Sequence, residues 1–233
     1  MGSFSGPRSA ARRVEHGRPG RVNEAQRAVE REVVAASRGL RAAVHSLAAA
    51  SMTRRNDPAA IAEAEALVRE ATALLDGDGL GEWWDGPAVA AEDRGLQAFR
   101  RRSLFQGALH PFSPELRWFE AEGPAGQPGL GFEVTLGRLY GGPPRSVHGG
   151  YIAGLFDELL GAVQAQAPGG GGFTGRLEIR YRALTPLDEP LRFMGWVEVS
   201  KGRRVTVAGR CEAEGVLCAD AKGLFVRPAQ GIG

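Results

Sequence analysis

Apolar residues recur at helical spacing in two stretches near the N-terminus. The first stripe lies on one side of a helix and consists of Val29, Val33, Ala36, Leu40, Val44 and Leu47. The second follows Asp57-Pro58, an N-cap with a proline at the first helical position, and consists of Ile61, Ala64, Val68, Ala71 and Leu75. The pattern predicts a helical hairpin over residues 23–76, which either packs on its own domain or supports a dimer.

From about Ser103 the pattern changes to the alternation that is typical of strands. "LRWFEAE" and "LGFEVTLG", separated by "GPAGQPG", predict a β-hairpin. One long helix follows, and then four strand-like runs: "FTGRLEIRYRAL", "LRFMGWVEV", "RRVTVAGRCEA" and "VLCADAKGLFV". The order β-β-α-β-β-β-β predicts an α+β domain in which an antiparallel sheet wraps around one long central helix.

The chain therefore divides into three parts. Residues 1–22 are rich in Gly, Pro, Ser and Arg and are expected to form a disordered basic tail. Residues 23–102 hold the helical hairpin and a linker, in which Trp83 and Trp84 are expected to contact a neighbouring surface. Residues 103–233 form the α+β domain.

One face of the predicted central helix is apolar, and the other carries glycines and one acid. The apolar arc holds Ile152, Leu155, Phe156, Leu159, Leu160 and Val163. Gly150, Gly154, Asp157 and Gly161 line up on the opposite side, whereas Glu158 faces elsewhere, beside Tyr151. Because each glycine costs a helix about 0.5–1 kcal/mol relative to alanine, something must approach this backbone closely. Either Asp157 faces a ligand, or the strip is a crowded helix contact in which Asp157 bonds a neighbour.

The residues before this helix favour the ligand. "PPRSVHGG" brings His148, Gly149 and Gly150 to the helix N-terminus, where unpaired N–H groups and the positive end of the dipole attract an oxyanion. A carboxylate and an oxyanion site would then lie about two turns apart, which is the combination that acyl transfer to water needs. For His148 itself, a structural role at the helix entry, with a hydrogen bond to the backbone, is favoured over proton transfer.

"VHGGYIAGLFDELLG", "FTGRLEIRYRALTPL" and "ADAKGLFV" resemble the hotdog-fold acyl-CoA thioesterases, in their PaaI-like and THEM-type branch, over residues 116–227. The resemblance implies a hotdog fold and a homodimer or dimer of dimers with active sites at the subunit interface. It implies that Asp157 is the catalytic carboxylate, acting as nucleophile or general base, and that the Gly150 N–H polarises the thioester carbonyl, with His148 and Gly149 shaping the turn. Thr174 matches the threonine that orients water. Many relatives also carry an amide side chain shortly before the histidine, which "YGGPPRS" lacks, so the water-positioning arrangement stays open.

Coenzyme A, as part of the substrate, would bring phosphates. Lys201, Arg203 and Arg204 in "VSKGRRV" supply positive charge in a turn and are the candidate phosphate contacts, the alternative being a solvated turn. No other cofactor is expected. The four histidines are scattered and no Cys/His spacing suits zinc, so no metal site is expected either.

The composition is ordinary for a globular protein, with 43% hydrophobic and 24% charged residues and a net charge of +2. No stretch is apolar and long enough to span a membrane or to act as a secretory signal, and two cysteines are too few for a disulfide framework, so a cytoplasmic location is expected. Strand alternation predicts that Cys211 points inward and Cys218 outward.

Three other functions remain open. The fold could bind acyl-CoA without catalysis, or it could act as a hotdog dehydratase or hydratase. Nucleic-acid binding through the arginine-rich tail is the least favoured. Phe112, Trp118 and Phe156 are the candidates for the wall of the pocket that holds the acyl group.

Overall fold

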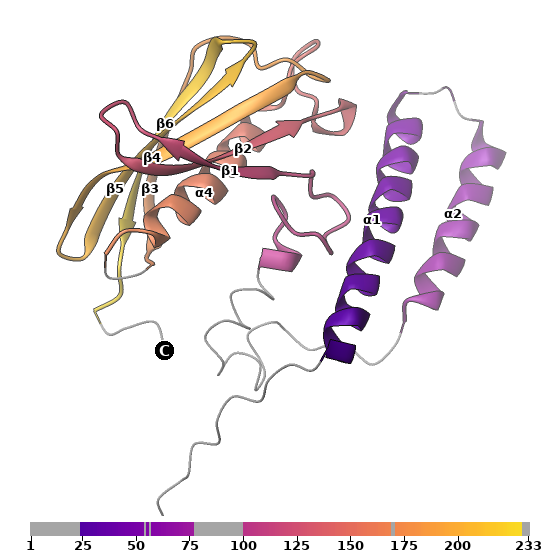
Figure 1. Ribbon diagram of the computed structural model, residues 1–233. Coiled ribbons are helices and arrows are strands. Elements are labelled where there is room, and N and C mark those ends of the chain that lie inside the picture. Colours follow the sequence, from indigo (N-terminus) through magenta and orange to yellow (C-terminus); the bar gives the residue numbers. More distant parts are fainter. Residues whose placement is uncertain (1–23, 54, 56, 77–99, 169–170, 230–233) are drawn as a thin grey trace, which may run out of the picture.

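The computed structural model describes residues 24–53, 55, 57–76, 100–168 and 171–229 (Figure 1). The predicted basic tail and the tryptophans of the linker, Trp83 and Trp84, lie outside these residues. Within the described part, no helix is both long and apolar enough to cross a membrane.

The predicted helical hairpin is confirmed as α1 (Glu24–Thr53) and α2 (Pro58–Leu74). Asp57 caps α2 as expected, because its Oδ1 accepts the N–H of Ala60 at 2.9 Å. The apolar stripes of both helices stay largely open to solvent: Leu40 and Leu47 on α1 are 46% and 45% exposed, and α2 buries no residue. On α1, His45 meets the edge of the Tyr140 ring, 6.0 Å between centroids, so α1 is the helix that contacts the remaining domain.

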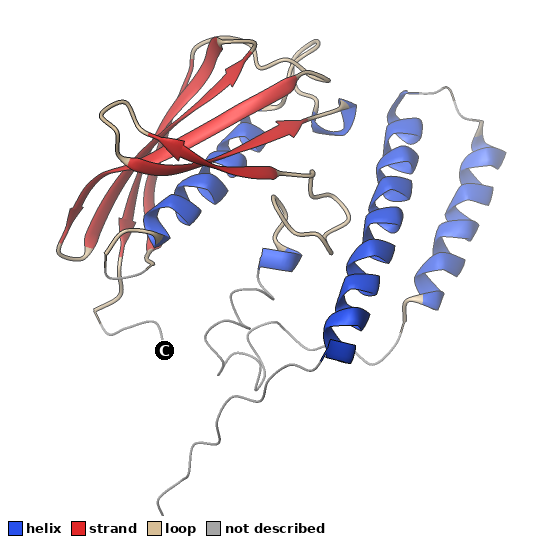
Figure 2. Ribbon diagram, viewed as in Figure 1, coloured by secondary structure: helices blue, strands red, loops and turns tan. Residues whose placement is uncertain are grey.

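The second half of the chain forms one antiparallel sheet of six strands around a single long helix (Figures 1 and 2). The strands are β1 (Arg117–Glu122), β2 (Pro128–Thr135), β3 (Phe173–Tyr181), β4 (Pro190–Lys201), β5 (Arg204–Ala213) and β6 (Val216–Val226). They are ordered β1-β2-β4-β5-β6-β3, so β1 and β3 are the edges. The helix α4 (Gly149–Ala165) lies against the inner face of the curved sheet, and the short 3-10 helix η1 (Arg138–Tyr140) precedes it. This arrangement confirms the predicted α+β hotdog fold.

The core lies between α4 and the sheet. All six residues of the predicted apolar arc are buried, with 0–2% of each exposed. Phe156 packs edge-on against Phe193 of β4, 5.2 Å between ring centroids, and is fully enclosed, so its assignment to a pocket wall was wrong. Gly195 and Gly209 are paired on β4 and β5 directly beneath Leu159 and Leu160, where an added Cβ would lie 3.1–3.3 Å from leucine methyl groups. Close packing of helix on sheet therefore depends on small residues at these positions.

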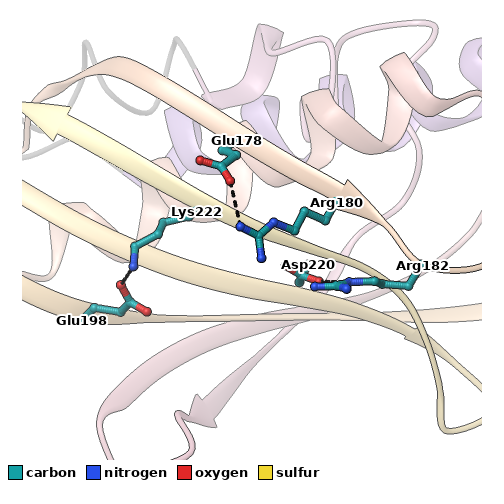
Figure 3. A network of polar contacts seen from close by, with 6 residues as sticks. All are labelled: Glu178, Arg180, Arg182, Glu198, Asp220 and Lys222. Atoms are coloured by element: carbon teal, nitrogen blue, oxygen red, sulfur yellow. Dashed lines mark hydrogen bonds and ion pairs between the residues drawn. The ribbon is translucent and has the colours of Figure 1, made fainter.

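The outer face of the sheet is polar. Figure 3 shows three ion pairs on this face. Glu178 and Arg180 pair along β3 at 3.2 Å, Arg182 just after β3 pairs with Asp220 of β6 at 2.5 Å, and Lys222 of β6 pairs with Glu198 of β4 at 2.6 Å. These side chains are exposed enough that each pair adds little stability. On β3 the outer face thus carries Glu178 and Arg180, whereas Leu177 and Ile179 pack against the core from the other face.

One of the two cysteines differs from expectation. Cys211 is buried as predicted, but Cys218 is also buried, 1% exposed, and both belong to the same core cluster. The register of β5 and β6 shifts between Cys211 and Glu212, which interrupts the regular alternation on which the prediction relied. Both thiols are free, and burial raises the pKa of each above its usual range.

Candidate active site

The His-Gly-Gly sequence forms the entry to α4. His148 is the N-cap residue, with φ −61° and ψ 129°, and its Nδ1 accepts the N–H of Gly150 at 3.0 Å. This is the structural role that the sequence favoured for the histidine. It also means that the N–H of Gly150, which was predicted to donate to the thioester carbonyl, already donates to a side chain of the same protein.

Asp157 lies on α4 about two turns further on, and its carboxylate is exposed. The Oγ1 of Thr174 donates a hydrogen bond of 2.8 Å to Asp157 Oδ1, so helix α4 and edge strand β3 bring together two of the predicted site residues. No ion pair involves Asp157 among the described residues. The hydrogen bond to Oδ1 therefore fixes the direction of the carboxylate, and the side chain stays accessible to solvent.

Glu158, the adjacent acid, faces elsewhere as predicted. It accepts hydrogen bonds from the Oγ of Ser103, at 2.8 Å, and from the Nε2 of Gln106. Burial is the largest influence on this carboxyl and raises its pKa above the usual range, while the two hydrogen bonds oppose the shift. Glu158 thus ties the segment before β1 to the helix, whereas Asp157 is left for other contacts.

Phe105, in the segment that Glu158 holds, explains one glycine of the strip. A Cβ added at Gly154 would lie 2.0–2.7 Å from the Phe105 ring, which also packs on Tyr151 at 5.1 Å between centroids. The close approach that the sequence assigned to a ligand is made here by the protein's own side chain. At Gly161 an added Cβ would meet nothing within 4 Å, so that position remains open.

Gly150 and Asp157 cannot act on the same carbonyl within one chain. Seven residues of α-helix separate them, which is about 10 Å along the axis. Asp157 lines neither the hollow beside Tyr140 nor the two hollows described on the outer face of the sheet. Within one chain the two predicted groups therefore act at separate places on α4.

The predicted phosphate contacts lie at the turn between β4 and β5, where Gly202 has φ +57°. Lys201 and Arg204 line a hollow of about 440 Å³ on the outer face of the sheet, together with Arg176 and Lys222. Arg203 is directed away from them, because its Nε donates to the carbonyl of Arg227 at 2.7 Å. The structure thus brings two of the three residues into one basic hollow and holds the third against the C-terminal segment.

This turn lies at the same end of the sheet as Thr174. Arg204 pairs with Val226, which in turn pairs with Phe173, the neighbour of Thr174. Two strand spacings, roughly 10 Å, separate the basic turn from the start of β3. A phosphate at this turn would lie at the same end of the sheet as Thr174, the residue that donates to Asp157.

The two other pocket candidates, Phe112 and Trp118, have no contact with Asp157 or His148 among the contacts described, and one residue near His148 was missed. Phe112 is 45% exposed, and Trp118 is 37% exposed and packs on Phe132, 5.1 Å between ring centroids. Sequence analysis did not single out Tyr181, whose hydroxyl donates to the carbonyl of Gly149 at 2.8 Å. The alternation of β3, which places Tyr181 on the same face as Leu177 and Ile179, was the signal that could have found it.

No group of three or more His, Cys, Asp or Glu residues suited to a metal occurs in the described part of the chain.

This chain is similar to several solved structures. One is the crystal structure of a thioesterase superfamily protein, 30% identical, which matches over 82% of this chain and 94% of its own length with a TM-score of 0.64. Thioesterase superfamily member 2 from Mus musculus is 14% identical over 49% of this chain and 82% of its own, with a TM-score of 0.42. A phenylacetic acid degradation-related protein from Ralstonia eutropha is 17% identical over 48% of this chain and 83% of its own, with a TM-score of 0.41. A scan against protein-family models and a search of curated proteins gave no match.

Proposed function

This chain belongs to the thioesterase superfamily, and from that premise we propose that it hydrolyses acyl thioesters, with coenzyme A or an acyl carrier as the thiol. The hydrogen bond of 2.8 Å between Thr174 Oγ1 and Asp157 Oδ1 carries the proposal, because it aims an exposed carboxylate without neutralising it. Water and the thioester yield a carboxylic acid and a free thiol. Asp157 either removes the proton from the water that attacks the carbonyl carbon, or attacks that carbon itself, so that the C–S bond breaks, the thiol leaves and water then hydrolyses the resulting anhydride.

The Gly150 N–H is proposed to stabilise the negative charge that develops on the carbonyl oxygen. Because His148 Nδ1 now accepts this N–H at 3.0 Å, the substrate oxygen must replace the imidazole or share the amide with it. The His148 side chain is exposed, so it has room to turn away. Gly149 and His148 shape this turn rather than transfer protons.

A homodimer is proposed to complete the site, with a dimer of dimers as the larger assembly. The separation of about 10 Å between Gly150 and Asp157 is too long for one carbonyl, but an antiparallel second copy of α4 would bring Gly150 of one protomer opposite Asp157 of the other. Strand β3 is an edge with unpaired backbone groups, and Phe173 and Tyr181 on it are 66% and 54% exposed. Antiparallel pairing of two β3 strands would join the sheets and bring the helices side by side.

The basic hollow is proposed to hold the phosphates of coenzyme A. Lys201 and Arg204 line it with Arg176 and Lys222, and a phosphate prefers such a cluster because each cation donates charged hydrogen bonds. Of these, Lys222 is already paired with Glu198 at 2.6 Å, so Lys201 and Arg204 are the principal contacts. Arg203 is proposed to add positive charge without contacting the phosphates, because its side chain is bonded to the Arg227 carbonyl.

One observation favours a second function, acyl-CoA binding without turnover. The engaged Gly150 amide leaves the carbonyl site filled by the chain's own imidazole. A protein of that kind would bind the ester and leave it intact.

A hydrolysis screen of the full chain tests the proposal. Short, aromatic and long acyl-CoA esters are incubated with the protein, thiol release is recorded, and ester binding is measured by calorimetry. Turnover of at least one class is expected. Tight binding with no thiol released would support the non-catalytic function instead, and hydration of an unsaturated acyl-CoA would support the hydratase. A variant that removes the Asp157 carboxylate is compared with Glu178→Gln. This control removes a carboxylate from the exposed outer face of the sheet, away from the site.

A further inference from the structure

Tyr181 contacts the peptide that joins Gly149 to Gly150. It lies at the end of β3, on the face of the sheet that meets α4, and its hydroxyl donates to the Gly149 carbonyl at 2.8 Å. A Cβ added at Gly149 would lie 3.3 Å from both the Cζ and the hydroxyl oxygen of Tyr181. The first glycine of the His-Gly-Gly sequence therefore leaves room for this tyrosine.

The carbonyl of Gly149 and the N–H of Gly150 belong to one planar peptide unit. A hydrogen bond that fixes the carbonyl oxygen also fixes the direction of the N–H on the other side of the plane. The N–H in turn donates to His148 Nδ1 at 3.0 Å. Tyr181 and His148 thus hold the same peptide from its two ends.

We propose that Tyr181 is a positioning residue that aims and polarises the Gly150 N–H toward the thioester carbonyl. This inference rests on the proposed thioesterase function. A donor on the carbonyl of an amide strengthens the N–H of that amide as a donor, by about 10–30% in condensed-phase estimates. When the substrate oxygen takes the place of the His148 imidazole, the bond to Tyr181 is the one that still fixes the peptide plane.

The role requires the hydroxyl and not the ring. Tyr181 is 54% exposed, so its ring contributes little to the core, and a phenylalanine could keep the contact with Gly149. A purely structural tyrosine would affect stability or assembly but would leave the chemistry of the bound carbonyl unchanged. Substitution by phenylalanine therefore separates the two roles.

The test compares wild type, Tyr181→Phe and Tyr140→Phe in thioester hydrolysis. Tyr140→Phe is the matched control, because the Tyr140 hydroxyl also donates to a backbone carbonyl, that of Phe112 at 3.0 Å, outside the proposed site. Loss of an oxyanion donor costs about 10²–10³ in kcat, and since Tyr181→Phe weakens the donor without removing it, kcat is expected to fall about tenfold. KM and the oligomeric state should not change, and Tyr140→Phe should keep kcat within about twofold.

A spectroscopic measurement reads the carbonyl directly. A ¹³C-labelled acyl-CoA is bound to Asp157→Asn, which slows turnover, and the infrared stretch of its carbonyl is recorded with and without Tyr181→Phe. A smaller shift to low frequency in the double variant supports the role. An unchanged frequency together with wild-type kcat in Tyr181→Phe would overturn it, while a wild type with no turnover at all would remove the proposed function itself.

Gly149→Ala provides a second variant, in case Tyr181→Phe fails to fold. It keeps the tyrosine but pushes it from the carbonyl, because the new methyl group lies 3.3 Å from the hydroxyl oxygen. The kcat should fall with little change in KM, as for Tyr181→Phe. Wild-type kcat in folded Gly149→Ala would contradict the proposal.

Discussion

Thr174→Val removes one hydrogen bond and keeps the shape of the side chain. In the native chain Thr174 Oγ1 donates to Asp157 Oδ1 at 2.8 Å, within the normal range for a hydroxyl bonded to a carboxylate. A hydrogen bond to a charged group contributes about 1.5–3 kcal/mol, and because both side chains are exposed, the lower end applies here. If that energy orients the carboxylate in the transition state, about 1.5 kcal/mol corresponds to roughly a tenfold loss of kcat.

Steady-state hydrolysis, followed by thiol release, measures this loss. Thr174→Val should lower kcat about tenfold with little effect on KM, whereas Thr174→Ser keeps a hydroxyl at the same position and should retain most of the rate. Circular dichroism and the thermal midpoint serve as checks of folding, since the edge strand β3 tolerates a β-branched residue. A Thr174→Val enzyme with the kcat of wild type would refute the idea that this hydrogen bond positions the catalytic group.

Three further predictions concern the helix strip, the buried acid and the basic hollow. Gly154→Ala should destabilise the chain by about 1–3 kcal/mol, because its Cβ would lie 2.0–2.7 Å from the Phe105 ring. Gly161→Ala, with nothing within 4 Å, should stabilise it by about 0.5–1 kcal/mol, and denaturant unfolding that moved both variants in one direction would refute this account of the strip. Because burial raises the pKa of Glu158 in the folded chain, its contribution to stability is complete below the unfolded pKa of about 4.3 and is lost as the pH rises through the folded value. The unfolding free energy of Glu158→Gln relative to wild type should therefore improve from pH 4 to pH 7, and a difference that does not vary with pH would contradict the raised pKa. The double variant Lys201→Ala, Arg204→Ala should raise KM for an acyl-CoA about tenfold and leave KM for an acyl-pantetheine, which lacks the nucleotide phosphates, unchanged. Arg203→Ala should raise KM less, and an increase as large as that of the double variant would indicate a general charge effect instead of contact.

The fold could be predicted because its signals are local and repeated. The apolar arc of α4 includes Leu155 and Leu160, which are both fully buried, and strand alternation placed Cys211 of β5 inside, as found. Asp57 and Pro58 marked the start of α2 by chemistry alone. Each of these features depends on residues within a few positions of one another, so no knowledge of the tertiary structure was needed.

What the sequence missed depends on contacts between distant segments. Phe105 reaches Gly154 from a segment 49 positions earlier in the chain, and no periodicity in either stretch indicates the other. Tyr181 meets Gly149 across 32 positions, and the bond between His148 and the Gly150 amide depends on one side-chain rotamer. Thr174 was named through the family resemblance, not through spacing, and its hydrogen bond to Asp157 came only from the structure. The prediction for Cys218 was wrong for a different reason. It assumed that side chains alternate strictly between the two faces of the strand, and a single register shift breaks that alternation.

The kcat of Asp157→Asn on the best acyl-CoA ester, measured beside that of the wild type, tests the central claim most directly. The amide has the size of the carboxylate and can still accept the Thr174 hydroxyl, but it can neither take a proton from water nor attack a carbonyl. The account predicts a fall of at least about 10²-fold with substrate binding preserved. Turnover within a few-fold of wild type would show that this carboxylate is not the catalytic group.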